Sequence, residues 1–260
     1  MVGSDLDIES IRQELTNGVI GREIYHHNSV GSTMDEARLL AEQGVAEGVV
    51  VIAEEQTSGR GRFNRKWISP PGENLSFSVL LRPVFGQLAY MNMAATLAVV
   101  RAVAKLTGCD PGIKWPNDVR IDGRKISGIL IETALEAGKV RYAIVGIGVN
   151  VNLDPHEHPE IGPIATSISS QVSAKVDRTL VLKLVLEFFD EFYEMIKNGV
   201  SLTEEWAGTL ETLGRIVQLR WLDQVVEGKA EAVDEKGNLL LRRSDGSVFT
   251  AVAGEVTLQV

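Results

Sequence analysis

Four cationic side chains fall within nine residues of a chain whose formal net charge is −9. Arg60, Arg62, Arg65 and Lys66 lie in the segment GRGRFNRKW, residues 59–67. Arginine presents a planar fork of donors that suits carboxylate and phosphate oxygens, and alternate glycines let the backbone approach a ligand closely. The segment is therefore predicted to bind an anion, and its like charges predict that it is mobile when empty and ordered by the ligand. The alternative is an exposed loop without function, because charge runs are usually solvated.

A second group of polar residues flanks a predicted hairpin in GIKWPNDVRIDGRKISGILIET, residues 112–133. The Asp-Gly pair at 122–123 is a strong signal for a two-residue turn, so the KWPND loop and the KISGIL strand should lie close together. Asn117 and Asp118 supply an amide and an acid, Lys125 could meet a carboxylate, and Gly128 could admit a flat ligand against the backbone. From spacing alone, Asp118 could equally be an ordinary acidic residue of a turn, and Lys125 an exposed charge on the hairpin surface.

Motifs for other kinds of nucleotide or covalent chemistry are missing from the sequence. It contains no GxxxxGK[ST], no GxGxxG that opens a helix after a strand and no GxSxG. His156 and His158 have neither the helical spacing nor the soft ligands typical of a metal site. Ser32 and Thr33 precede a predicted helix, where their hydroxyls either cap the helix or face a polar ligand.

The elements that position these residues follow from hydrophobic periodicity and turn signals. Helices are predicted over 8–15, 33–44, 90–106 and 179–197. Thr33 and Glu36 have the spacing of a capping box at the start of the second helix, which should run to about Gly44. Gly108 is the predicted terminator of the third. Besides the hairpin, strands are predicted over 49–53, 75–82 and 140–151. After Leu213, five short strands separated by turns at EKGN, SDG and AGE predict a small barrel appended to this body.

Composition limits the classes of protein that the chain can be. With 260 residues, 44% of them hydrophobic and 23% charged, it is an ordinary globular chain with one large and one small domain. The acidic balance disfavours a broad grip on nucleic acid. The single cysteine, Cys109, excludes an intrachain disulfide and favours a reducing, cytoplasmic location, and no apolar run is long enough to predict a membrane span or a signal peptide.

Three ordered motifs resemble the biotin protein ligases, the enzymes that join biotin to a carrier lysine. They are GRGRFNRKW, KWPNDVRIDGRKISGILIE and GIGVNVN, and with the small barrel they cover nearly the whole chain. The resemblance implies an α+β fold: a mixed β-sheet flanked by helices, of the class II aminoacyl-tRNA synthetase and biotin synthetase type, with an SH3-like C-terminal β-barrel. We expect a catalytic domain over 1–211 and the SH3-like domain over 212–260.

The resemblance also implies a two-step acyl transfer through biotinoyl-5′-AMP. The first step brings a carboxylate next to a triphosphate, and cations have to offset their repulsion. For two unit charges at roughly 4 Å and an effective dielectric of 20, this repulsion is about 4 kcal/mol. Arg60, Arg62 and Lys125 would supply them, and Asp118 would orient or deprotonate the incoming amine. The remaining residues implied for biotin are Ser32, Thr33, Gln56, Gly59, Gly61 and Gly128, and those for ATP are Arg65, Lys66, Trp67, Asn117 and Asn150.

The same resemblance sets expectations about cofactors and partners. Mg²⁺ would be held mainly by the phosphates of ATP, with no metal site in the protein, and the partner would be a biotin carboxyl carrier domain of acetyl-CoA carboxylase or a similar enzyme. Some relatives carry Asn after Ser-Thr where this chain has Met34, which puts that minor biotin contact in doubt. About twenty residues precede the first strand-like segment, so we do not expect the DNA-binding domain of the repressor members or a DNA partner. Because the apolar runs are short, we do not expect a membrane partner either. A homodimer stays open.

Two rival functions remain compatible with parts of the sequence. A lipoate or octanoate ligase would use the same scaffold, although that group lacks this basic loop. A nucleic-acid binding module would use Arg60, Arg62, Phe63 and Trp67 for stacking and phosphate contacts, against which the acidic total weighs.

Overall fold

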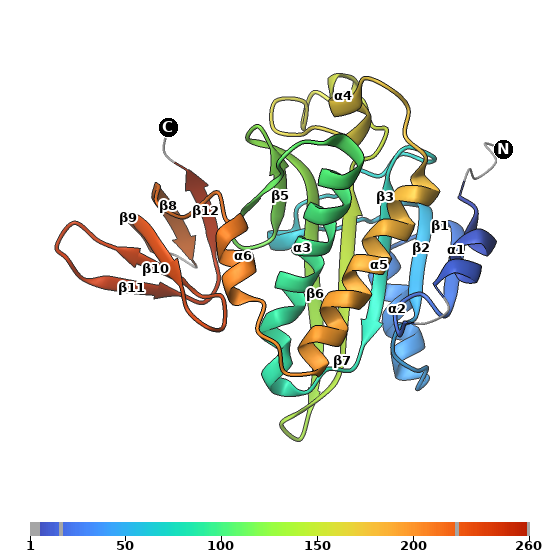
Figure 1. The fold of residues 1–260 in the computed structure, drawn as a ribbon, viewed down its shortest axis with the longest axis horizontal. Helices are drawn as coiled ribbons and strands as arrows, with labels where there is room; N and C mark the ends of the chain where they lie inside the picture. Colours follow the sequence, from blue (N-terminus) through green and yellow to red (C-terminus); the bar gives the residue numbers. More distant parts are fainter. Residues whose placement is uncertain (1–5, 16–17, 222–223, 259–260) are drawn as a thin grey trace.

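The body of the protein is a seven-stranded mixed sheet, called the main sheet below, in a computed structural model that describes residues 6–15, 18–221 and 224–258. The strand order is β1-β2-β3-β7-β6-β5-β4, with β1 parallel to β2 and the other neighbours antiparallel (Figure 1). The strands are β1 Ile24–Val30, β2 Val50–Gln56, β3 Leu75–Leu81, β4 Gly112–Lys114, β5 Asp118–Ile121, β6 Arg124–Glu136 and β7 Lys139–Val149.

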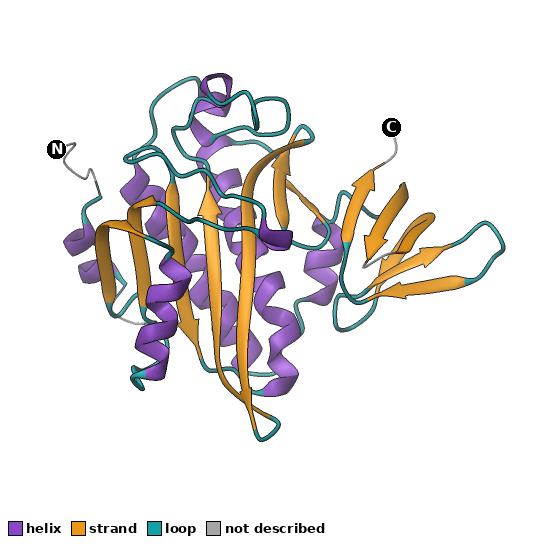
Figure 2. Ribbon diagram, turned by 180° about the vertical axis from the view of Figure 1, so that it is seen from behind, coloured by secondary structure: helices purple, strands orange, loops and turns teal. Residues whose placement is uncertain are grey.

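Helices cover both faces of the main sheet. They are α1 Ile8–Glu14, α2 Thr33–Glu42, α3 Leu88–Thr107, α4 Ile168–Val172, α5 Arg178–Lys197 and α6 Thr203–Thr209, with 3-10 turns η1 Arg62–Asn64, η2 Phe85–Gln87 and η3 Pro155–Glu157. The long helices α3 and α5 lie side by side on one face (Figure 1), and α2 lies on the opposite face together with the basic loop (Figure 2). The main core therefore fills the space between the sheet and the α3–α5 pair.

The two long helices confirm the periodicity of the sequence. The α5 helix buries the aromatic side of its stripe, including Phe189, Phe192 and Tyr193, because residues three or four apart share one face. The α3 helix ends at Gly108, which adopts the left-handed conformation with φ of 71°, as the terminator prediction required.

The Asp122–Gly123 turn is confirmed as the tip of a hairpin between β5 and β6. Its two residues have φ values of 48° and 75°, the positive pair that a type I′ turn needs. The pairing places Asp118 opposite Gly128, so the two ends of the KWPND and KISGIL motifs lie next to each other.

Sequence patterns misplaced or missed other elements. The cap of α2 is Ser32, whose Oγ accepts from the backbone N of Met34, so the predicted capping box of Thr33 and Glu36 is wrong. Thr33 instead donates its backbone N–H to Gln56 on β2, a long-range contact that no local motif encodes. Helix α6 was not predicted, because it has neither a strong period nor an end signal of its own.

The C-terminal strands form a separate antiparallel sheet, called the C-terminal sheet below. Its order is β11-β10-β9-β8-β12, with β8 Ile216–Trp221, β9 Gln224–Val233, β10 Leu239–Arg242, β11 Val248–Ala251 and β12 Glu255–Leu258. The five predicted strands are thus confirmed, whereas their closure into a barrel stays a prediction. Hydrogen bonds from Trp115 Nε1 to the Gly237 carbonyl (2.9 Å) and from Arg62 to the Gly254 carbonyl (3.0 Å) join the two sheets' loops.

Within the described ranges, no helix combines the length and the apolar character that a bilayer crossing requires.

Candidate active site

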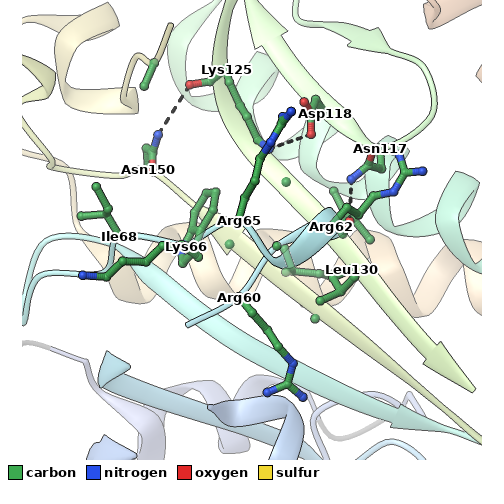
Figure 3. A pocket seen from close by; sticks show the side chains of 18 of the residues that line it. Arg60, Arg62, Arg65, Lys66, Ile68, Asn117, Asp118, Lys125, Leu130 and Asn150 are labelled. Carbon is green, nitrogen blue, oxygen red and sulfur yellow. Dashed lines mark hydrogen bonds and ion pairs between the residues drawn. The ribbon is translucent and has the colours of Figure 1, made fainter. Parts of the chain in front are cut away.

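A cavity of about 810 Å³ lies on the α2 side of the main sheet and collects the residues singled out in the sequence (Figure 3). The predicted site residues on its wall are Ser32, Thr33, Gln56, Arg60, Gly61, Arg62, Arg65, Lys66, Trp67, Asn117, Asp118, Lys125, Gly128 and Asn150. Gly59 is not on the wall. A Cβ at Gly59 would lie 2.8 Å from the carbonyl oxygen of Trp67, so this glycine lets the two ends of the basic loop approach each other.

The floor of the cavity depends on glycines in β6 and β7. The indole of Trp67 lies so close to Gly148 that a Cβ there would be 2.4 Å from two ring atoms. A Cβ at Gly128 would lie 2.7 Å from Lys125 Nζ, so the lysine crosses the sheet surface at this point. Trp67 Nε1 also donates to Ser76 Oγ (3.2 Å), which fixes the ring as a flat wall. Glycine at positions 128 and 148 therefore leaves room for the Lys125 and Trp67 side chains against the strands.

One end of the cavity presents neutral polar groups. Gln56 Oε1 accepts from the backbone N of Thr33 (2.8 Å) and from its Oγ1 (3.1 Å), and Thr33 Oγ1 lies 2.8 Å from Ser78 Oγ. Because Oε1 is occupied, the Nε2 group of Gln56 is the end of the amide that can serve a ligand. The Sδ atom of Met34 lies 2.9 Å from where a Cβ would stand at Gly146, so an apolar thioether completes this end of the cavity.

The other end of the cavity contains an ion pair between two predicted catalytic residues. Lys125 Nζ lies 2.7 Å from Asp118 Oδ1, and the side chains point toward each other in Figure 3. Among the described residues, no hydrogen bond is donated to the second carboxylate oxygen of Asp118. The Asn150 amide donates to the backbone carbonyls of Lys125 (3.5 Å) and Thr166 (3.0 Å), so it supports the strand that carries the lysine.

Arg62 enters the same end of the cavity from the basic loop. Its Nη1 donates to Asn117 Oδ1 (2.9 Å) and its Nη2 to the Gly254 carbonyl (3.0 Å), so both partners are neutral. Burial lowers the pKa of the Arg62 guanidinium, although it remains charged at neutral pH. Asn117 in turn donates to the Ile129 carbonyl (2.7 Å), which anchors it to β6. Arg62 is therefore a held, partly desolvated cation whose charge has no bonded counter-ion.

Arg60 is placed differently from what its predicted role suggested. Its guanidinium makes two hydrogen bonds of 2.8 Å to the Asp35 carboxylate on α2 and lies 3.2 Å from Glu132 on β6. Figure 3 shows the side chain extending away from Lys125. The hydrogen bond to Arg60 lowers the pKa of Asp35. In this arrangement the charge of Arg60 is already neutralised, so its direct part at a ligand carboxylate stays a prediction.

The remaining cations of the basic loop lie at the mouth of the cavity. Arg65 Nη2 contacts both carboxylate oxygens of Glu255, on β12, at 2.5 and 2.6 Å. Lys66 is exposed and extends outward (Figure 3). Carboxylates from α2, β6 and the C-terminal sheet therefore oppose the mutual repulsion that the sequence predicted for this loop. Whether the loop becomes mobile without a ligand stays a prediction.

Lys114 is a cavity residue that the sequence analysis missed. It lies on β4 directly opposite Asp118 on β5, and burial lowers the pKa of its ammonium group. No hydrogen bond or ion pair joins it to another described residue. Its position before Trp115 in the KWPND motif was the available signal, because a tight turn after a strand residue brings it opposite Asp118.

The cavity as a whole pairs a neutral, hydrogen-bonding end with a cationic end. No group of three or more metal-ligating side chains occurs among the described residues. The neutral end suits an uncharged polar ring in a mostly apolar slot. The cationic end suits the transfer of a phosphoryl or acyl group between anions, because Lys125 pairs with Asp118 and the charges of Lys114 and Arg62 also act on that carboxylate.

Family models match two segments of the chain. The biotin/lipoate A/B protein ligase family matches residues 28–150, and the biotin protein ligase C-terminal domain matches residues 212–258. The bifunctional ligase/repressor BirA of Bacillus subtilis is 35% identical over 246 residues, which cover 93% of this chain and 76% of that protein. The biotin--[acetyl-CoA-carboxylase] ligase of Mycobacterium tuberculosis is 37% identical over 171 residues, with 63% and 61% covered.

Solved structures agree with these matches. The biotin protein ligase of Aquifex aeolicus in complex with biotin and ATP is 32% identical with a TM-score of 0.77, covering 92% of this chain and 99% of that one. The biotin protein ligase of Leishmania major in complex with biotinyl-5-AMP is 25% identical with a TM-score of 0.58, covering 89% and 99%. The similarity thus extends over both sheets.

Proposed function

The chain belongs to the biotin protein ligase family, and we propose that it joins biotin to a lysine of a carrier protein in two steps. The carboxylate of biotin attacks the α-phosphorus of ATP and forms biotinoyl-5′-AMP, with pyrophosphate as the leaving group. The ε-amine of the carrier lysine then attacks the acyl carbon, and AMP leaves. Residues 1–211 would form the catalytic domain and residues 212–260 the SH3-like domain.

The observation that carries this proposal is the cationic end of the cavity. Lys125 pairs with Asp118, and Arg62 and Lys114 line the same cavity, beside a slot that ends in neutral polar groups. Two anions must meet in the first step, and preorganised cations stabilise the charge that develops on the α-phosphate. A site with balanced charges would not favour that encounter.

Biotin would lie along the floor of the slot. Thr33, Gln56 and Ser32 would hold the ureido group, whose donors and acceptors need partners in an apolar surrounding. Gly128 would let the ring or the acyl chain approach the backbone of β6. Met34 would contact the ring through its thioether in place of a polar side chain.

ATP would occupy the wider end toward the C-terminal sheet. Arg62 and Lys125 would bind the α-phosphate and the biotin carboxylate, and Lys114 would contact the departing pyrophosphate. Arg65 and Lys66 would close over the nucleotide, for which Arg65 has to exchange Glu255 for a phosphate. Trp67, Asn117 and Asn150 would border the adenosine.

Asp118 would act in the second step. Its Oδ1 is paired with Lys125, and its Oδ2 can accept a hydrogen bond from the incoming amine and orient it toward the acyl carbon. The amine must be neutral to attack, so a carboxylate within hydrogen-bond reach of its proton is the group that this step needs.

We expect Mg²⁺ to arrive bound to ATP. The acids on the cavity wall are Asp118, Glu160 and Glu255, and the described residues offer no cluster that would hold a metal by itself. The ion would neutralise phosphate charge in the first step. The carrier would be a biotin carboxyl carrier domain, since relatives are named as ligases for acetyl-CoA carboxylase.

Pyrophosphate exchange tests the first step and carrier labelling tests the second. The protein should exchange labelled pyrophosphate into ATP only when biotin is present, and should label a carrier domain with biotin. Lipoate in place of biotin is the matched control, because the family model also covers lipoate ligases. Exchange driven by lipoate and not by biotin would support the lipoate alternative and contradict the proposal.

A further inference from the structure

A second, smaller cleft lies behind Arg62, between the body and the C-terminal sheet. Its volume is about 290 Å³, and its walls come from the first turns of α3, the loop after β4, the turn between β9 and β10 and the turn between β11 and β12. It shares Arg62, Asn117 and Trp115 with the main cavity. A group bound in this cleft therefore lies next to the cationic end of the active site.

The walls of the cleft combine an apolar surface with positive charge. Leu88, Ala89, Leu130 and the exposed Val252 supply the apolar part, next to the buried Trp115 and Trp206. Arg62 and Lys236 supply two cations, and none of the described lining residues is an aspartate or a glutamate. The nearby carboxylate of Asp234 is occupied, because it accepts from the backbone N atoms of Lys236 and Asn238, both at 2.9 Å. The cleft is thus complementary to an acidic group beside an apolar one.

The turn that carries Lys236 is firmly seated. The Gly237 carbonyl accepts from Trp115 Nε1 (2.9 Å), and a Cβ at Gly237 would lie 2.7 Å from Met93 Cε. This glycine has φ of 76°, a conformation that L side chains rarely adopt. The chain therefore holds Lys236 at the rim of the cleft without support from a ligand.

The volume of the cleft, about 290 Å³, lies at the lower end of the range of small-molecule pockets. In an extended segment, a side chain two positions from a given residue points to the same side about 7 Å away. An extended segment that inserts its lysine into the main cavity and runs toward Arg62 would place a flanking side chain in this cleft, since both cavities are lined by Arg62.

We propose that this cleft docks the segment of the carrier protein that flanks its acceptor lysine, and that it selects a segment with an acidic side chain beside an apolar one. This inference rests on the proposed ligase function. Lys236 pairs with the acid, and Leu88 and Val252 contact the apolar side chain. The cleft thereby orients the carrier for the second step and takes no part in adenylate formation.

The test separates the two steps with charge reversal at Lys236. Lys236→Glu should lower kcat/KM for an acetyl-CoA carboxylase carrier domain by about tenfold or more, since rim charges steer association. Pyrophosphate exchange, and capture of the adenylate by hydroxylamine, should stay at wild-type rates because neither uses the cleft. Lys229→Glu, an exposed lysine on β9 outside the cleft, is the matched control.

A second pair of variants tests the apolar wall in the same assays. Val252→Asp should also slow transfer to the carrier selectively, whereas Val248→Asp, on β11 and 47% exposed, should not. Neutralising the acids beside the acceptor lysine of the carrier should lower kcat/KM for the wild-type enzyme and leave the Lys236→Glu variant unchanged.

Two outcomes would overturn the docking inference alone. In the first, Lys236→Glu and Lys229→Glu behave alike with the carrier. In the second, Lys236→Glu slows hydroxylamine capture as much as transfer to the carrier. If the wild-type protein itself shows no biotin-dependent exchange, the proposed function fails first, and the docking inference fails with it.

Discussion

Two groups of charges differ in balance: one reaches the main cavity through Arg60 alone, and the other lies wholly on its wall. The first, the paired group, consists of Arg38, Arg60, Asp35 and Glu132. The second, the unbalanced group, consists of Lys114, Lys125, Arg62 and Asp118. In the paired group each cation has a carboxylate, whereas in the unbalanced group three cations share one. A chain with an overall excess of acid thus keeps a local excess of positive charge, which is the feature that an anionic substrate requires.

The number of cations in a segment of the sequence therefore does not show which of them can bind an anionic substrate. Arg60 and Arg62 are two residues apart and both line the cavity, yet one is neutralised by α2 and the other is held by an amide and a carbonyl. Neutral partners orient a cation without cancelling its charge. We therefore expect substitutions in the unbalanced group to affect catalysis more than substitutions in the paired group.

The largest effect is expected for Lys125→Ala. Removal of a preorganised donor at the reacting atoms should slow biotin-dependent pyrophosphate exchange by about 100- to 1,000-fold. Circular dichroism should be unchanged, because the side chain is about one-third exposed and lies on a sheet surface. Lys139→Ala, an exposed lysine at the start of β7, is the control. Wild-type exchange by Lys125→Ala would place Lys125 among ordinary surface charges.

A smaller loss of activity, with a gain in stability, is expected for Lys114→Met. Loss of one charge-assisted contact to pyrophosphate, worth about 1.5–3 kcal/mol, should reduce exchange by about 10- to 100-fold. Burial lowers the pKa of Lys114 in the folded protein, so the unfolded chain binds this proton more tightly and the ammonium group costs stability at neutral pH.

The melting temperature of Lys114→Met at pH 7 should therefore exceed that of the wild type, by about 2–4 °C for each kcal/mol that is relieved. This difference in melting temperature should shrink as the pH rises toward 10.5, the pKa of Lys114 in the unfolded chain, because the lysine then loses its proton in the unfolded state as well. Unaltered exchange together with a lower melting temperature would show that Lys114 has a purely structural role.

The smallest effect is expected for Arg60→Ala in the paired group. Weaker retention of biotin or of the adenylate, by about tenfold or less, should accompany a small loss of stability, because exposed pairs contribute about 0.2–1 kcal/mol. Equilibrium dialysis with biotin and thermal melts measure the two quantities. An effect on exchange as large as that of Lys125→Ala would break the distinction between the groups.

The acid range provides a control for the Arg60 result. Arg60 lowers the pKa of Asp35, so the contribution of this pair is present above the unfolded pKa of 3.8 and is lost as the pH falls through the lower, folded value. The stabilities of wild type and Arg60→Ala should therefore converge in strong acid. A constant difference at all pH values would indicate that Arg60 acts through packing.

Features with a local physical cause could be predicted from the sequence. The aromatic stripe of α5, the glycine that ends α3 and the Asp122–Gly123 turn depend on residues within a few positions of one another. The predicted site residues line one cavity, except Gly59 at the start of the basic loop, because the three motifs occupy adjoining strands and the loop that crosses them. Their individual roles remain proposals.

Features that depend on partners distant in the chain could not be predicted. Thr33 bonds to Gln56 and leaves the cap to Ser32, and Glu255 reaches Arg65 from 190 residues away. Periodicity and turn signals carry no information about such contacts, since they report only neighbours along the chain.

The sequence by itself determined which chemical groups are present, the local elements that carry them and the family that these motifs resemble. Only the tertiary structure decided which of the cations are neutralised and which are left to meet an anion. The physical reason is that electrostatic energy depends on distances between charges in space, and carboxylates from α2, β6 and β12 approach some arginines and not others.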